Sequence, residues 1–146
     1  MKRILLIIMI VCALIDSGSA VAKQIQSPVK NNFVTIKDGK IFRGGKPYYY
    51  VGTNLWYGAM LGSIGKGGNR KRLCRELDEL KRIGIDNLRV LVGSDGPRGV
   101  KAKVEPTLQI KPGVYNDTIL AGLDYLLQQM GKRGMVAILY LNNSWE

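Results

Sequence analysis

Aromatic and amide side chains recur in this sequence beside the ends of short apolar segments. Asn54 and Trp56 follow one such segment, and Asn142 and Trp145 follow another. Aromatic rings stack on the C–H faces of a sugar while amide groups hydrogen-bond to its hydroxyls. These four residues predict a carbohydrate-binding site. Two plainer interpretations stay open: Trp56 also suits a core position, and Asn54 also suits a loop cap.

Arg89 interrupts the apolar segment formed by residues 87–92. A cation in a buried strand needs an anionic partner, because desolvation of an unpaired charge is costly. A catalytic carboxylate would serve as that partner, and so would a structural aspartate on a neighbouring strand. The sequence leaves both alternatives open.

Glycoside hydrolysis is the chemistry that a sugar site suggests, and it uses two carboxylates that face each other across the scissile bond. Asp95 and Glu146 lie near predicted strand ends, but nothing pairs them, so no catalytic residue is assigned within this segment. The chain contains no histidine, which excludes Ser-His-Asp and Cys-His catalysis and argues against a zinc site. We expect neither a metal site nor a cofactor.

The glycine-rich stretch over residues 58–68 does not have the spacing of a phosphate-binding P-loop. Met60 stands where the first glycine is needed, and Gly67 stands where the magnesium-binding hydroxyl is needed. We interpret the stretch as a flexible loop.

The elements that position these residues alternate between strand and helix. Residues 33–37 and 40–43 predict a hairpin with a type I′ turn at Asp38-Gly39. Strands are expected at 48–54, 87–92 and 135–141, and a long polar loop at 93–113. Helices are expected to begin at Asn69 and at Asn116 or Asp117, with apolar stripes at Leu73, Leu77, Leu80 and Ile83 and at Leu120, Leu123, Leu127 and Met130. Cys74 borders the first stripe and is interpreted as a packing residue.

This order predicts a parallel α/β sheet, because crossover connections are right-handed. Apolar strands suit a sheet buried on both faces, yet only two helices are available to cover it. We therefore expect part of a larger fold. A doubly wound sheet and a (β/α)₈ barrel begin with the same unit, and both place the active site at the C-terminal ends of the strands.

The first 22 residues have the pattern of a signal peptide: Lys2 and Arg3, an apolar core, and an Ala-Val-Ala cleavage site. Secretion to an extracellular or periplasmic location is expected, with no membrane span after processing. Residues 23–32 form a flexible lead-in, and residues 33–146 form the domain. The 22 basic and 11 acidic residues give a net charge of +11, but the basic residues are scattered, so no nucleic-acid partner is expected.

Six motifs, in order, resemble the N-terminal third of the endo-β-1,4-mannanases of glycoside hydrolase family 5. They are Gly44-Gly45-Lys46-Pro47, Gly52-Thr53-Asn54, Arg89 with Ser94-Asp95-Gly96, Pro112-Gly113-Val114-Tyr115-Asn116, Gly122-Leu123-Asp124, and Asn142-Asn143 with Trp145.

This resemblance implies an incomplete (β/α)₈ barrel, or TIM barrel, made of the N-terminal hairpin, the first three strands and two helices. It implies retaining hydrolysis of mannan, glucomannan or galactomannan by two glutamates located beyond residue 146, so the segment alone should be inactive. Arg89 would support the nucleophile, while Asn54, Trp56, Asn142 and Trp145 would contact substrate. Another family 5 β-glucanase or cellulase, and a truncated non-catalytic remnant, are the alternatives.

Overall fold

The computed structural model describes residues 33–96 and 104–141, which belong to two compact units that divide after Tyr49. The first unit contains a small antiparallel sheet in the order β1 (Val34–Lys37), β2 (Lys40–Arg43) and β3 (Lys46–Pro47). Asp38 and Gly39 have φ angles of 51° and 69°, as a type I′ turn requires. The predicted hairpin is confirmed.

Residues 1–32 lie outside the described ranges, so the predicted signal peptide and lead-in are not part of this description. Among the described helices, none is long and apolar enough to cross a membrane.

The second unit is built on a parallel sheet in the order β4 (Gly52–Asn54), β5 (Asn87–Leu91) and β8 (Val136–Tyr140). The parallel arrangement is confirmed. The prediction of a strand over residues 48–54 was too long, because pairing with β5 begins only where Gly52 meets Asn87. The amide of Tyr48 instead donates to the Ile41 carbonyl at 2.8 Å, within the first unit.

Two helices were predicted correctly, α3 (Arg70–Arg82) and α4 (Asp117–Lys132). Asn69 caps α3 by accepting from the amide of Arg72 at 2.9 Å, and Asn116 caps α4 by accepting from Thr118 at 3.2 Å. The buried face of α4 differs from the predicted stripe. Its buried residues are Ile119, Gly122, Leu123, Leu126, Gln129 and Met130, and Leu120 and Leu127 are only partly buried.

The prediction of a flexible loop is wrong for the start of the glycine-rich stretch, which forms the short helix α2 (Gly58–Gly62). A Cβ on Gly62 would lie 2.2 Å from the Gly122 carbonyl oxygen, and one on Gly122 would lie 2.2 Å from that of Ala59. Glycine therefore lets the backbones of α2 and α4 touch. Burial against α4 offsets the poor intrinsic helix propensity of glycine.

The predicted polar loop over residues 93–113 also contains structure. Strand β6 (Gln109–Lys111) lies within this range and pairs antiparallel with β7 (Val114–Tyr115), which follows it and precedes α4 in the sequence. Leu108 is buried against Gly93, where a Cβ would come within 2.1 Å of the Leu108 Cβ. Periodicity could not predict this pair, because β7 is only two residues long and the surrounding sequence is polar.

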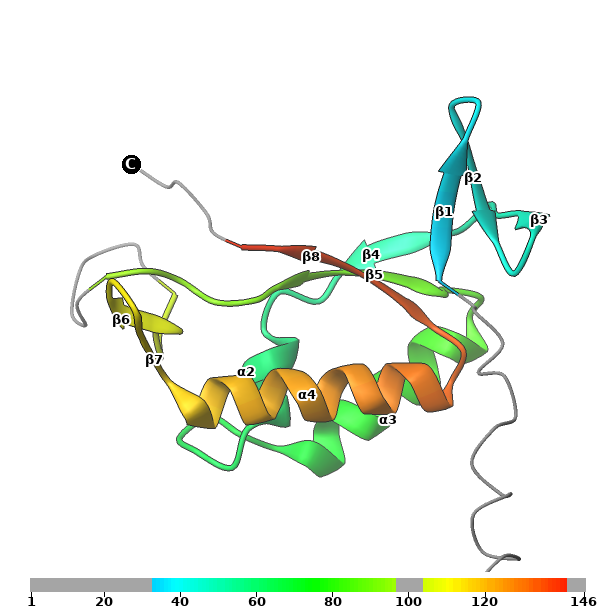
Figure 1. Ribbon diagram of the computed structural model, residues 1–146. Helices are drawn as coiled ribbons and strands as arrows, with labels where there is room; N and C mark the ends of the chain where they lie inside the picture. Colours follow the sequence, from blue (N-terminus) through cyan, green and yellow to red (C-terminus); the bar gives the residue numbers. More distant parts are fainter. Residues whose placement is uncertain (1–32, 97–103, 142–146) are drawn as a thin grey trace, which may run out of the picture. The chain divides into compact units, whose positions relative to one another are not determined.

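The described helices α2, α3 and α4 lie on one side of the sheet formed by β4, β5 and β8 (Figure 1). The core fills that interface and includes Leu55, Leu73, Leu77, Leu88, Val90, Ile119, Leu126 and Met130. The opposite face, called here the open face, carries Arg89 and Ile138, both exposed. No described element of the second unit covers it.

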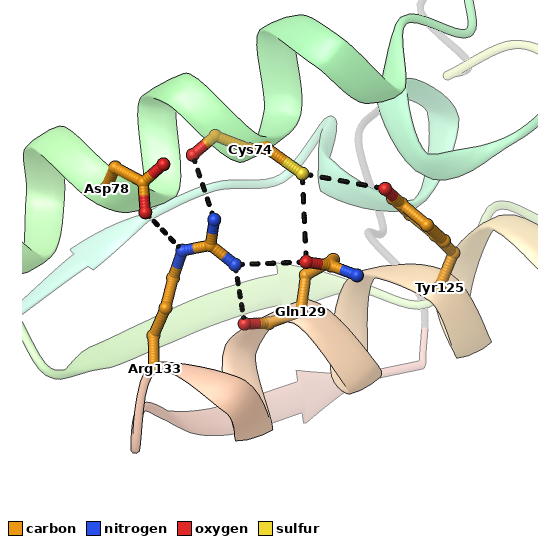
Figure 2. A network of polar contacts seen from close by, with 5 residues as sticks. All are labelled: Cys74, Asp78, Tyr125, Gln129 and Arg133. Carbon is orange, nitrogen blue, oxygen red and sulfur yellow. Dashed lines mark hydrogen bonds and ion pairs between the residues drawn. The ribbon is translucent and has the colours of Figure 1, made fainter.

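A polar network joins the outer helices α3 and α4 (Figure 2). Arg133 donates to Asp78 at 2.7 Å and to the carbonyl oxygens of Gln129 and Cys74 at 3.0 and 3.4 Å. The thiol of Cys74 lies 3.5 Å from the Tyr125 hydroxyl and 3.7 Å from the Gln129 amide oxygen. Cys74 is therefore at the helix interface, as predicted, but its thiol has polar neighbours.

Candidate functional site

The open face brings together residues from all three strands of the parallel sheet. Asn54 pairs with Arg89, and Arg89 pairs with Ile138. Partners in a parallel sheet point to the same side. These three residues line a shallow pocket of about 270 Å³ together with Tyr50, Gly52, Thr53 and Asn87.

Arg89 lies on this face with its side chain exposed rather than buried. Its Nη1 donates to Asn54 Oδ1 at 3.4 Å, and its guanidinium carbon lies 3.6 Å from the centroid of the Tyr140 ring. No ion pair within residues 33–96 and 104–141 involves Arg89. Within the described residues the cation is therefore exposed and has no anionic partner.

The two predicted partners of Arg89 can now be compared. A structural aspartate on a neighbouring strand finds no support in the described sheet, since neither β4 nor β8 contains an acidic residue. The guanidinium instead retains N–H groups that no described acceptor engages. A carboxylate that approaches the open face could accept two parallel hydrogen bonds from these N–H groups.

Asn54 is exposed at the end of β4, and its side-chain oxygen accepts from Arg89. The alternative interpretation, a loop cap made to its own backbone, is not what the described contacts show. The amide group is therefore placed beside the guanidinium, with its NH₂ group available to a hydroxylated ligand.

Trp56 is 45% exposed, which contradicts the alternative of a core position. Its ring meets Tyr57 edge-on, with centroids 5.4 Å apart and planes at 86°. Tyr57 in turn donates to Glu76 at 3.0 Å, and Arg72 holds the other oxygen of Glu76 at 2.6 Å. Burial, and then the neighbouring Glu76 carboxylate, raise the pKa of Tyr57, so its phenol remains a hydrogen-bond donor and fixes the ring that supports Trp56.

The comparison with known proteins fits this geometry. The model of the GH family 5 β-mannosidase-like family matches residues 31–146. The chain belongs to glycoside hydrolase family 5. Its relatives include putative mannan endo-1,4-β-mannosidase 9 of Oryza sativa subsp. japonica, which is 32% identical over 103 residues, covering 70% of this chain and 23% of the relative.

Solved structures of family 5 give the same result. The family 5 mannosidase from Rhizomucor miehei is 38% identical with a TM-score of 0.74, over 80% of this chain and 29% of that one. The endo-1,4-β-mannanase from the same organism is 22% identical with a TM-score of 0.55, over 73% and 29%, and shows the fold alone. The chain therefore spans about a quarter of the length of its family 5 relatives.

The other residues predicted for the site of this family 5 chain are not part of the described open face. Asp95 accepts from the Gln109 side chain at 3.3 Å and forms a bridge to that residue, which indicates a structural role beside β6. Asn142, Trp145 and Glu146 lie outside the described residues. Within the described ranges, no group of His, Cys, Asp or Glu residues could hold a metal ion.

Sequence reasoning missed Tyr140, whose ring lies over the Arg89 guanidinium. It lies in an uninterrupted apolar segment and looked like an ordinary strand residue. The signal that would have found it is register: Tyr140 stands two residues after Ile138, the partner of Arg89, and therefore shares its face.

Proposed function

We propose that the complete gene product is a secreted endo-β-1,4-mannanase. In this proposal the 146 residues supply the hairpin, the first three strands and two helices of a (β/α)₈ barrel, whose interior is the open face. The observation that carries the proposal is Arg89, which stands exposed at this face beside Asn54 with no acidic partner among the described residues. The names of the curated relatives supply the substrate class.

Two glutamates from residues beyond 146 would perform retaining hydrolysis, one as acid/base and one as nucleophile. Arg89 would donate to the nucleophilic carboxylate, stabilise its anionic form and orient it. Asn54 and Trp56, with Asn142 and Trp145, would bind the sugar units of mannan, glucomannan or galactomannan. The 146 residues alone would then bind the polysaccharide weakly and hydrolyse none of it.

A second candidate activity is the removal of single mannose units from the end of a chain. The observation that favours it is the higher identity to the Rhizomucor miehei mannosidase, 38%, than to the endo-mannanase of that organism, 22%. The mannosidase has also been solved, as a mutant, in complex with mannosyl-fructose. This alternative keeps the family and changes only the position of cleavage.

Product analysis separates these activities. An endo-acting enzyme releases a mixture of manno-oligosaccharides from β-1,4-mannan and lowers its viscosity at an early stage, whereas an end-acting enzyme releases mannose alone. Mixed oligosaccharides support the main proposal, and mannose as the sole early product supports the second candidate. Hydrolysis of cellulose in preference to mannan would overturn both and favour another family 5 activity.

Secretion is a separate part of the proposal and rests on the pattern of residues 1–22. Expression of the complete gene product with its own N-terminus should yield an exported protein whose first residue lies near Lys23. A cell-retained protein that begins at Met1 would overturn this part alone.

A further inference from the structure

Tyr140 contacts the guanidinium of Arg89 through the face of its ring. The guanidinium carbon lies 3.6 Å from the ring centroid, well inside the range of cation–π contacts. Tyr140 pairs with Leu91 across the sheet, and Arg89 pairs with Ile138. Tyr140 is therefore the diagonal neighbour of Arg89 on the same face, within reach of a long side chain.

Arg89 is held from two sides. Asn54 on β4 accepts one N–H at 3.4 Å, a long hydrogen bond, and the guanidinium carbon lies 3.6 Å from the centroid of the Tyr140 ring on β8. This separation is too short for an N–H group to point at the ring, so the two planes must stack. Stacking leaves the N–H edge of the group available, and this edge is the part that a carboxylate binds in a bidentate manner. An exposed arginine without such a contact samples many rotamers. Binding an anion would restrict it to one of them, at a cost in side-chain entropy.

We propose that Tyr140 is a positioning residue, whose ring holds the Arg89 guanidinium flat on the open face so that its N–H edge meets a carboxylate. That the carboxylate is a catalytic one rests on the proposed function. Tyr140 itself touches neither substrate nor reacting atoms in this account. Its ring matters and its hydroxyl does not, so phenylalanine should replace it.

The first test is nuclear magnetic resonance of the complete gene product labelled with ¹⁵N-arginine. The Arg89 Nε–Hε signal is assigned by its loss in Arg89→Lys, and the ring current of Tyr140 should shift it upfield. Tyr140→Phe should keep this shift, and Tyr140→Leu should abolish it. Tyr140→Val provides a second ring-free variant that suits a strand, and Tyr49→Leu, an exposed tyrosine of the first unit, is the matched control.

The second test follows binding and rate. In titrations with acetate as the probe, Tyr140→Leu should weaken binding at Arg89 by about tenfold, because an unheld arginine side chain must be ordered on binding. In mannan hydrolysis the same variant should lower kcat by about tenfold with KM unchanged, because only the orientation of Arg89 is altered. Tyr140→Phe should stay within about twofold of the parent in both measurements.

The outcomes separate this proposal from the proposed function. A ring-free variant that keeps the Arg89 shift, or binds acetate as tightly as the parent, overturns the positioning role. If the parent hydrolyses no β-mannoside, the proposed function fails, and the Arg89 shift and the acetate titration then decide the role of Tyr140. A fall in KM rather than kcat in Tyr140→Leu would also count against positioning.

Discussion

Asn54 and Arg89 are direct partners in the parallel register of β4 and β5, and the arginine donates to the amide oxygen at 3.4 Å. The pair stands on the face of the sheet that the helices leave bare. Neither side chain contributes to the core, so both are free to serve a ligand. Their role can therefore be tested without unfolding the protein.

Arg89→Ala should separate activity from stability. Because the side chain makes no part of the described core, the variant should fold and unfold cooperatively like the parent. Mannan hydrolysis by the complete gene product should fall by about a hundredfold or more, as for the loss of a preorganised charge at a reacting group. Initial rates and urea unfolding check this, with Arg75→Ala, an exposed arginine of α3, as the control. A comparable loss of activity in both variants would contradict the assignment.

Gly122→Ala should destabilise the protein by about 3 kcal/mol or more, because its Cβ would lie 2.2 Å from the Ala59 carbonyl oxygen and 2.7 Å from the Ser63 nitrogen. Gly131→Ala on the same helix is the matched control. Nothing lies within 4 Å of its Cβ, so helix propensity should stabilise it by up to about 1 kcal/mol. Urea unfolding of the two variants should give opposite signs, and equal effects would refute the α2–α4 contact.

The Asp78–Arg133 ion pair should make stability depend on acid. The hydrogen bond from Arg133 lowers the pKa of Asp78, so the pair contributes stability above about pH 4 and loses it as the pH falls through the folded-state pKa. Asp78→Asn should therefore be less stable than the parent at neutral pH, and the difference should shrink in acid. Thermal melting at several pH values measures this. A constant difference for Asp78→Asn would contradict the prediction.

The 146-residue chain, expressed alone, should self-associate and bind hydrophobic dyes, because the open face and the outer edge of β8 expose Ile138, Leu139 and Leu141. Ile138→Lys should reduce the association, measured by size exclusion with light scattering. Ile64→Lys replaces an equally apolar residue that is 80% exposed in the glycine-rich stretch and should have little effect. A soluble monomer that unfolds cooperatively would contradict the view that this is part of a larger fold.

Local signals in the sequence predicted much of the described fold. The start of α3 at Asn69 and the turn at Asp38-Gly39 depend on neighbouring residues only, and both were found correctly. For α4 the sequence left Asn116 and Asp117 open as the cap, and the cap is Asn116. Asn54 and Arg89 were identified from their places near strand ends. The contact between them follows from parallel pairing.

The errors come from contacts between residues far apart in the sequence. Helix α2 exists because Gly62 meets Gly122, and no propensity scale favours a helix that begins and ends with glycine. Arg89 is the one exposed residue of β5, and its exposure depends on which neighbouring elements cover that face, which a single strand does not reveal. Tyr140 was missed because its importance depends on the register of β8 against β5.

The most direct test of the account is the assay of the complete gene product on β-1,4-mannan and on cellulose, with Arg89→Ala assayed in parallel. The account predicts release of reducing ends from mannan in preference to cellulose, lost in the variant, and none from the isolated 146 residues. A preference for cellulose, full activity without Arg89, or reproducible mannan hydrolysis by the 146 residues alone would contradict it.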